Sequence, residues 1–360
     1  MNVLLIASDV NLIGGIEKYN RDFIYALEQA GVTPVLIERK KGGFFAKISF
    51  VFRVFFEFLR SRPDFIFCAH LNFSPLCLTL KYLFKVKYSI ALYGIEIPGL
   101  RSGLKRKSGL AADVLITISD YSKSLILEHL PSCESRIYML PSSVDGTIFD
   151  IRPKRKDLEE LHKLSGRPVV LSLSRLASDE YKGQDRVLRA MPLVLKEVPN
   201  AMYLVVGGGN DSRVDSFLSE NPWLRENVIF TGAISNDLRV DYYNLPDVYV
   251  LPTKYDGFCI VFIESLACGV PVIAADGFGC RAGLFDGELG LLVPPDDIPE
   301  IAKAIVKVLK RTAPSHLYDR ENLRRKTLSI YGVGRWNERV KALVSHISVG
   351  DISSVSKNKI

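Results

Sequence analysis

Two carboxylates eight positions apart mark the second half of the chain. Asp256 is followed directly by Gly257, and Glu264 lies farther along the same stretch. The apolar run 248–251 ahead of them predicts a buried strand, and a glycine–proline stop signal predicts a helix over 259–268. We therefore expect Asp256 on the loop before this helix and Glu264 within it.

The start of this helix would present the backbone N–H groups of Phe258, Cys259 and Ile260. The first N–H groups of a helix have no partner within it, so they attract anions and polar oxygen atoms. A loop carboxylate, such amides and a helical carboxylate suit a polyhydroxylated ligand that also carries phosphate. On spacing alone, a polar loop that leads into an ordinary amphipathic helix explains the same residues.

Two cations follow a predicted strand over 169–173. Arg175 comes directly after it, and Lys182 opens a helix near 183–196. Arginine offers fixed paired donors and lysine offers a mobile point charge, a combination that suits a diphosphate. The alternative is two solvated surface cations.

Two glycines, Gly14 and Gly15, separate a first predicted strand over 3–7 from a helix over 16–30. Glycines here let the backbone approach a phosphate at a helix N-terminus. The pattern is not GxGxxG, so the dinucleotide fingerprint is missing. A tight turn with positive φ is the competing interpretation.

Both halves of the chain alternate short apolar runs with helical stretches. Repeated strand–helix–strand units predict parallel sheets with helices on both faces. The expected fold class is α/β, with two doubly wound, Rossmann-like domains facing across a cleft, where ligands bind at the carboxyl ends of the strands. The predicted strands are 3–7, 34–37, 65–69, 88–92, 114–117, 137–140, 169–173, 202–206, 228–230, 248–251, 272–275 and 291–293. The predicted helices are 16–30, 44–61, 74–84, 103–110, 119–130, 183–196, 211–220, 236–243, 259–268, 297–311 and 319–330.

The length of 360 residues predicts two domains of ordinary size. We expect an N-terminal domain over 1–150, a charged linker over 151–166 and a C-terminal domain over 167–332. A final helix over 333–350 can return to the N-terminal domain, and the polar tail 351–360 is expected to be disordered.

Composition and charge narrow the class of protein. The chain is 48% hydrophobic and 24% charged, as in soluble globular proteins, and its net charge is +7. A basic balance suits nucleic acid, anionic lipid or phosphorylated ligands, but no nucleic-acid motif accompanies it. Six cysteines without paired spacing and the lack of a secretory signal predict a cytoplasmic protein with reduced core thiols. We expect no metal site and no cofactor, because no histidines have metal-ligand spacing.

Taken in order, these motifs resemble those of the family 4 glycosyltransferases of the GT-B type, the group 1 glycosyltransferases. The resemblance covers about residues 1–345 and is strongest in the C-terminal half. Each motif alone is weak, but their joint order and spacing are specific. The matching motifs are Gly14-Gly15-Ile16-Glu17, Pro141-Ser142-Ser143-Val144-Asp145, Ser174-Arg175-Leu176, Tyr181-Lys182-Gly183, Val206-Gly207-Gly208-Gly209, Phe230-Thr231-Gly232, Asp256-Gly257-Phe258 through Glu264, and Ala267-Cys268-Gly269-Val270-Pro271-Val272.

The resemblance implies a role for each matched residue. Glu264 would hold the ribose hydroxyls of a nucleotide-diphosphate sugar, and Asp256 would contact the transferred sugar. Arg175 and Lys182 would bind the diphosphate and stabilise it as it leaves, in place of a catalytic metal. The remaining donor-binding positions are Gly14, Gly15, Gly232, Gly257, Phe258, Cys259 and Ile260.

The chain departs from the family pattern at two positions. Asp256 is one methylene shorter than the usual glutamate. Tyr93-Gly94-Ile95-Glu96 follows a predicted strand where the family often has a histidine. Tyr93 or Glu96 could fill the catalytic role on the acceptor side; a half-buried aromatic at a strand end is an equal interpretation of Tyr93.

The segment 44–62 carries seven phenylalanines together with Lys47, Arg53, Arg60 and Arg62. A helix that is apolar nearly all round is either buried or in contact with lipid. Together with nearby basic residues, this segment fits an interfacial surface that seeks anionic lipid. A crossover helix packed into the N-terminal domain fits it equally.

We expect a retaining, metal-independent hexosyltransferase that uses a GDP- or UDP-linked sugar and a glycan or polyprenyl-lipid-linked acceptor in cell-envelope polysaccharide or glycolipid synthesis. Its place would be the cytoplasm, with peripheral contact at the inner face of the plasma membrane as an option. Two other classes remain open: a non-catalytic sugar-nucleotide or glycan-binding module, and an epimerase or phosphorylase of the same fold.

Overall fold

The computed structural model describes residues 1–12, 14–177 and 182–349. By its internal contacts the chain forms two compact units. The N-terminal unit comprises Met1–Ser143 together with the segment that begins at Val333, and the C-terminal unit comprises Val144–Gly332. The tail 351–360, which we predict to be disordered, lies outside the described residues.

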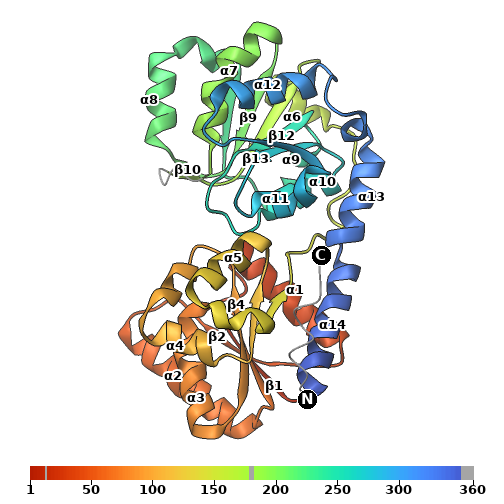
Figure 1. The fold of residues 1–360 in the computed structure, drawn as a ribbon. Coiled ribbons are helices and arrows are strands. Elements are labelled where there is room, and N and C mark those ends of the chain that lie inside the picture. The colour runs from red at the N-terminus through yellow and green to blue at the C-terminus, as the bar shows by residue number, and fades with distance from the viewer. Residues whose placement is uncertain (13, 178–181, 350–360) are drawn as a thin grey trace. The chain divides into compact units, whose positions relative to one another are not determined.

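The N-terminal unit is built on one six-stranded parallel sheet in the order β2-β1-β3-β4-β5-β6 (Figure 1). Its strands are β1 (Val3–Ser8), β2 (Val35–Arg39), β3 (Phe65–Cys68), β4 (Lys87–Leu92), β5 (Val114–Thr117) and β6 (Ile137–Met139). Its α-helices are α1 (Gly15–Gln29), α2 (Phe44–Ser61), α3 (Ser74–Phe84), α4 (Gly103–Ala111), α5 (Asp120–His129) and α14 (Val333–Val349).

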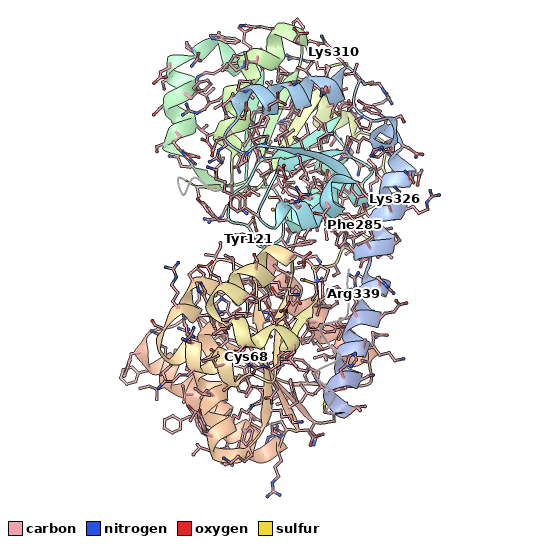
Figure 2. All side chains as sticks on the ribbon, in the orientation of Figure 1. Cys68, Tyr121, Phe285, Lys310, Lys326 and Arg339 are labelled. Atoms are coloured by element: carbon pink, nitrogen blue, oxygen red, sulfur yellow. The ribbon has the colours of Figure 1, made fainter. Side chains whose placement is uncertain are left out.

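Alternation along the strands divides the core of this unit between the two faces of the sheet. Leu4 and Ile6 of β1 point to the face covered by α2, where Val54 is fully buried. On the other face, the ring of Phe67 packs edge-on against Phe23 of α1, with ring centroids 4.9 Å apart. Cys68, labelled in Figure 2, is buried in the first of these layers. All six cysteines are buried and free.

The last helix, α14, packs against α1 within the N-terminal unit. The ring of its Trp336 lies edge-on to Tyr19 and Phe23, with centroid distances of 5.4 and 6.1 Å. The Trp336 indole N–H donates to the carbonyl oxygen of Pro141 at 2.5 Å. A buried indole needs such an acceptor, so these contacts fix α14 on this unit.

The C-terminal unit has a second six-stranded parallel sheet, in the order β11-β9-β7-β12-β13-β14, and a two-stranded pair, β10-β8. Its strands are β7 (Val169–Leu173), β8 (Leu176–Ala177), β9 (Met202–Val206), β10 (Gly209–Asn210), β11 (Val228–Gly232), β12 (Val248–Leu251), β13 (Val272–Ala275) and β14 (Gly290–Val293). Its α-helices are α6 (Lys156–Leu161), α7 (Gln184–Glu197), α8 (Ser212–Glu220), α9 (Arg239–Tyr243), α10 (Ile260–Ala267), α11 (Cys280–Gly283), α12 (Ile298–Leu309) and α13 (Arg320–Tyr331).

By its contacts, the segment 151–166 that we predict as a linker is part of the C-terminal unit. The Arg155 guanidinium donates to the Asp241 carboxylate at 2.9 Å, and Leu158 of α6 is buried. The charges that favour a linker in the sequence are therefore used in ion pairs with the neighbouring helix α9.

The α/β class with two Rossmann-like sheets is confirmed. The predicted strands agree with the observed ones to within two residues, because buried parallel strands form continuous apolar runs. The sequence does not predict the β8–β10 pair, since two-residue strands leave no periodic pattern.

Candidate functional site

An ion pair links two of the predicted site residues at the carboxyl ends of neighbouring strands. Asp256 lies on the loop between β12 and α10, as expected, and Lys182 lies on the segment that enters α7 after β7. The Lys182 ammonium is 2.7 Å from the Asp256 carboxylate, and both side chains are 18% exposed. Because β7 and β12 are adjacent and parallel, their following loops meet at one edge of the sheet.

The backbone around Asp256 is held by the loop that follows β13. The Gly279 N–H donates to the Asp256 carbonyl oxygen at 2.8 Å. A Cβ atom on Gly279 would lie 1.9 Å from the Gly257 carbonyl oxygen, so only glycine allows this approach. Tyr255, just before, adopts a φ of 58°, which is rare for a residue with a side chain. The surrounding contacts therefore impose a specific conformation on this turn.

The backbone of Arg175 is fixed by the ends of three strands. The Gln184 side-chain amide donates to the Arg175 carbonyl oxygen at 3.0 Å. A Cβ atom on Gly207 would lie 2.0 Å from the Ser174 carbonyl oxygen, and the Gly207 N–H donates to the Gly232 carbonyl oxygen at 2.9 Å. The ends of β7, β9 and β11 thus pack closely here, while the Arg175 side chain stays exposed. Tyr181, which belongs to the lysine motif, lies outside the described residues.

Glu264 lies in α10 with no solvent exposure. Its carboxylate accepts hydrogen bonds from the Tyr243 hydroxyl at 2.8 Å and from the Arg239 guanidinium at 2.5 Å. Burial raises the pKa of Tyr243, and the Glu264 carboxylate raises it further. Burial alone would lower the pKa of Arg239, but the Glu264 carboxylate, Tyr243 and Tyr249 together outweigh it, so the pKa of Arg239 is raised. The cation and the phenol hold the carboxylate in one orientation.

Arg239 and Tyr243 are site residues that sequence reasoning does not identify. Both belong to α9, which follows β11 and lies in the predicted helix 236–243. Their spacing of four places them on one face of a helix, and this is the only signal in the sequence. It carries no indication that the partner is Glu264.

The glycine pair in the N-terminal unit serves the start of α1. Gly14 caps α1 with a φ of 175°, an extended conformation, so the tight turn with positive φ is wrong for this residue. A Cβ atom on Gly14 would lie 2.1 Å from a carboxylate oxygen of Glu17. Gly14 therefore makes room for the Glu17 side chain, which folds back over the helix start, and Gly15 begins the helix.

Tyr93 lies directly after β4 and is only 8% exposed. Its hydroxyl lies 3.0 Å from the Ala69 carbonyl oxygen and 3.1 Å from the Asn20 side-chain oxygen. Burial raises the pKa of Tyr93 well above its usual value. The Tyr93 N–H donates to a carboxylate oxygen of Glu96 at 2.5 Å. Tyr93 is thus an aromatic at a strand end that is more deeply buried than the half-buried position predicted, and Glu96 stabilises its turn.

A third residue that the sequence does not single out is His70, which follows β3. Its Nδ1 accepts from the Asn72 N–H at 3.0 Å, so the neutral ring carries its proton on Nε2. Burial lowers the pKa of His70, and the carboxylates of Glu96 and Glu17 oppose this shift. The ring lies near that of Tyr93, with centroids 6.4 Å apart. His70 and Glu96 therefore form one polar cluster at the carboxyl edge of this sheet.

The described residues contain neither a metal centre nor a membrane span. Over 1–12, 14–177 and 182–349, no three His, Cys, Asp or Glu side chains are placed to hold a metal ion. None of the helices that the structure describes is long and apolar enough to cross a bilayer.

Comparison with known proteins bears on this site. Residues 153–327, which include the Lys182–Asp256 pair and Glu264, match the family described as glycosyl transferases group 1. This part of the chain belongs to the group 1 glycosyltransferases. The family resemblance noted in the sequence is confirmed.

Two curated relatives illustrate the similarity of this chain to known glycosyltransferases. A GDP-mannose-dependent alpha-(1-6)-phosphatidylinositol monomannoside mannosyltransferase of Mycolicibacterium smegmatis is 32% identical over 222 residues, which are 59% of this chain and 57% of the relative. A D-inositol 3-phosphate glycosyltransferase of Acidothermus cellulolyticus is 32% identical over 250 residues, which are 65% of this chain and 54% of the relative. The chain therefore matches little more than half the length of these relatives.

Solved structures resemble almost the whole chain. Sucrose-phosphate synthase from Thermosynechococcus elongatus has a TM-score of 0.81 at 20% identity, covering 98% of this chain and 100% of that chain. HepE of Anabaena in complex with UDP has a TM-score of 0.77 at 17% identity, covering 96% of this chain and 100% of that chain. At this level of identity the likeness concerns the fold, and the predicted GT-B fold is confirmed.

Proposed function

We propose that this chain is a retaining glycosyltransferase that moves a hexose from a nucleoside diphosphate sugar to a lipid-linked or glycan acceptor of the cell envelope. The observation that carries the proposal is the contact between Lys182 and Asp256 at the carboxyl edge of the second sheet. It joins a cation suited to a diphosphate with a carboxylate suited to sugar hydroxyls. Two further residues of the proposed donor site, Arg175 and Glu264, belong to the same unit.

In the proposed reaction, Arg175 and Lys182 bind the diphosphate of the donor. Negative charge develops on this group as the bond to the sugar breaks, and cations already in position stabilise it. Asp256 accepts hydrogen bonds from hydroxyls of the transferred sugar, while its ion pair orients Lys182 before the donor arrives. The amides from Gly257 to Ile260 contact the same sugar.

Glu264 accepts hydrogen bonds from the ribose hydroxyls in this proposal. Its contacts with Arg239 and Tyr243 support the role, since a ligating carboxylate must be held in one orientation. Because the Arg239 cation contacts the buried Glu264 carboxylate, this pair forms a charge-assisted hydrogen bond that fixes the acceptor in place.

A GDP-linked mannose is the donor we favour, and a lipid-linked acceptor the partner. The support is the 32% identity, over 59% of this chain, to a relative named as a GDP-mannose-dependent phosphatidylinositol monomannoside mannosyltransferase. Such an acceptor would put the enzyme at the cytoplasmic face of a membrane. UDP-linked sugars are the alternative donors.

The experiment uses purified full chain with GDP-mannose or UDP-glucose and a phosphatidylinositol-linked or polyprenyl-linked sugar acceptor. We expect release of nucleoside diphosphate only when donor and acceptor are both present. Nuclear magnetic resonance should show the same anomeric configuration in product and donor. Donor binding without turnover would favour a sugar-nucleotide-binding module, and turnover without an acceptor would favour an epimerase.

The same assay tests metal independence. Two cations already supply positive charge for the diphosphate, so activity should persist in excess EDTA. Complete loss with EDTA, followed by recovery with magnesium or manganese, would contradict the role given to Arg175 and Lys182.

A further inference from the structure

The helix α2 has two apolar faces in the N-terminal unit. One is buried against the sheet through Phe50, Val54 and Phe58. The opposite one carries Phe45, Phe52 and Phe56, whose exposed fractions are 84%, 71% and 65%. At 100° per residue these two rows point in opposite directions from the helix axis. A helix that packs on the core of a soluble domain needs only the buried row. The exposed row therefore indicates contact with another partner.

The helix α3 extends this exposed surface. Its last residues Tyr82, Leu83 and Phe84 are exposed, and the ring of Phe84 lies 4.8 Å from that of Phe58 on α2, measured between centroids. Both helices lie on the same face of the sheet and carry outward side chains in Figure 2. We call this surface the aromatic face. Its members are Phe44, Phe45, Ile48, Val51, Phe52, Phe56 and Leu59 of α2 with Tyr82, Leu83 and Phe84 of α3.

Positive charge surrounds the aromatic face. Between Lys40 and Arg62 the sequence has six Lys or Arg and one acidic residue, Glu57, so this segment carries a net charge of +5 (6 − 1). The exposed residues Lys85 and Lys87 add to it beside the end of α3. A protein partner with an ordinary mixed surface would not match this charge, whereas an anionic lipid surface would.

The helix α2 is suited to lie along a bilayer and not to cross it. Its 18 residues include four charged side chains, Lys47, Arg53, Glu57 and Arg60. Arg53, Glu57 and Arg60 form a strip between the buried and exposed rows, so they can stay in the headgroup region while the exposed row enters the acyl boundary.

We propose that the aromatic face docks this protein on an anionic lipid bilayer, with α2 lying in the interface plane. The charge between Lys40 and Arg62 attracts the surface, and the phenylalanines anchor it. Both interpretations of the segment 44–62 then hold, one for each row of α2. The docking rests on exposure and charge alone, so it stands or fails independently of glycosyl transfer.

The test is co-flotation of the full chain with vesicles of phosphatidylcholine, alone or mixed equally with phosphatidylglycerol. We expect binding to the mixed vesicles that weakens as salt rises, because exposed charges are screened. Phe45→Ser/Phe52→Ser/Phe56→Ser should reduce the partition coefficient by about 10-fold or more, since binding scales with inserted apolar area. The matched control is Trp223→Ser, which removes an exposed aromatic of the C-terminal unit and should leave binding unchanged.

Two triple charge-reversal variants distinguish attraction to anionic lipid from nonspecific binding to vesicles. Lys40→Glu/Lys41→Glu/Lys47→Glu should abolish the preference for phosphatidylglycerol. Lys196→Glu/Lys307→Glu/Lys326→Glu changes net charge equally at exposed positions of the other unit and should preserve the preference. Equal loss in both triple variants would overturn the proposal, because net charge alone would then explain the binding.

Two further measurements guard against misfolding and a different partner. Phe45→Trp in a Trp223→Phe background is a mild change, and brominated lipid should quench its fluorescence on binding. Lack of quenching would overturn insertion at this face.

Sedimentation velocity without lipid tests whether a second copy of the chain occupies the aromatic face. A dimer that the triple Phe-to-Ser variant abolishes, together with no vesicle binding by the wild type, would also overturn docking on lipid.

Discussion

The helices α2 and α10 are both strongly apolar, yet the structure uses them in opposite ways. α10 buries most of its side chains, including the Glu264 carboxylate. α2 leaves several phenylalanines in solvent. The difference follows from their positions in the layers. α10 follows β12, which has a neighbour on each side, and it packs against α13, whereas α2 contacts the edge strand β2.

The comparison shows that the polarity of a side chain does not by itself determine whether it is buried. A charged side chain can be buried beneath other elements when it has partners in fixed positions, as Glu264 has in Arg239 and Tyr243. An apolar side chain stays exposed where no element covers it. Substitutions in the two helices should therefore have unequal effects, and the following predictions proceed from the largest effect to the smallest.

The sharpest contrast is in stability. Glu264→Ala should destabilise the C-terminal unit by about 3 kcal/mol, since it leaves the Arg239 charge beside a cavity without its counter-ion. Phe52→Ala should change stability by no more than about 0.5 kcal/mol, because its side chain is already in water. Urea unfolding measures both. Adding Arg239→Met to Glu264→Ala should restore part of the loss; no recovery would contradict the ion-pair explanation.

Turnover should distinguish the proposed diphosphate site of the C-terminal unit from the helix α2. Lys182→Ala should lower turnover by about 10²-fold or more, the scale of one lost transition-state donor, and Arg175→Ala should do the same. Phe52→Ala should keep its turnover on an acceptor dissolved in detergent, where no bilayer is needed. Near wild-type rates in both cation variants, measured as diphosphate release, would contradict the diphosphate site.

A milder change separates the structural and binding roles of Glu264. Glu264→Gln keeps the shape but weakens the acceptance of hydrogen bonds from ribose, which should cost about 1–3 kcal/mol of nucleoside diphosphate binding. Calorimetry with GDP, after a melting curve that verifies folding, gives the dissociation constant. An unchanged constant would leave Glu264 as only a partner of Arg239.

The smallest expected effect concerns His70, whose side chain is partly buried. Its folded pKa is lowered by burial, so between this value and the unfolded value near 6.5 the unfolded chain binds more protons. Stability from this group is present above about pH 6.5 and is lost as pH falls through the folded pKa. The melting temperature of the His70→Gln variant should therefore fall less than that of the wild type between neutral and mildly acid pH. Equal losses would show that other groups, such as His162, whose pKa is also lowered by burial, account for the dependence.

The sequence predicts elements well and contacts poorly. Strands such as 169–173 and helices such as 44–61 follow from periodicity, since each residue's environment repeats along the element. Asp256 and Lys182 can be chosen as site residues because each follows a strand, but their 2.7 Å contact depends on the order of strands in the sheet. The partners of Glu264 and the cluster around His70 could not be predicted, because they join elements whose spacing in the chain carries no record of contact.

The bridge between Val144 and Gly332 has a consequence for how this gene can be cut and recombined. The two residues pair in parallel, and the Val144 N–H donates to the Tyr331 carbonyl oxygen at 2.8 Å, so the chain enters and leaves the C-terminal unit at one point. A coding cassette for 144–332 would therefore have both of its junctions side by side and could be exchanged whole between homologous genes. A gene that ends after the codon for Ser143 would instead encode a protein without α14, in which Tyr19 and Phe23 lack their contacts with Trp336. The host reading frame must be kept on both sides of the insert.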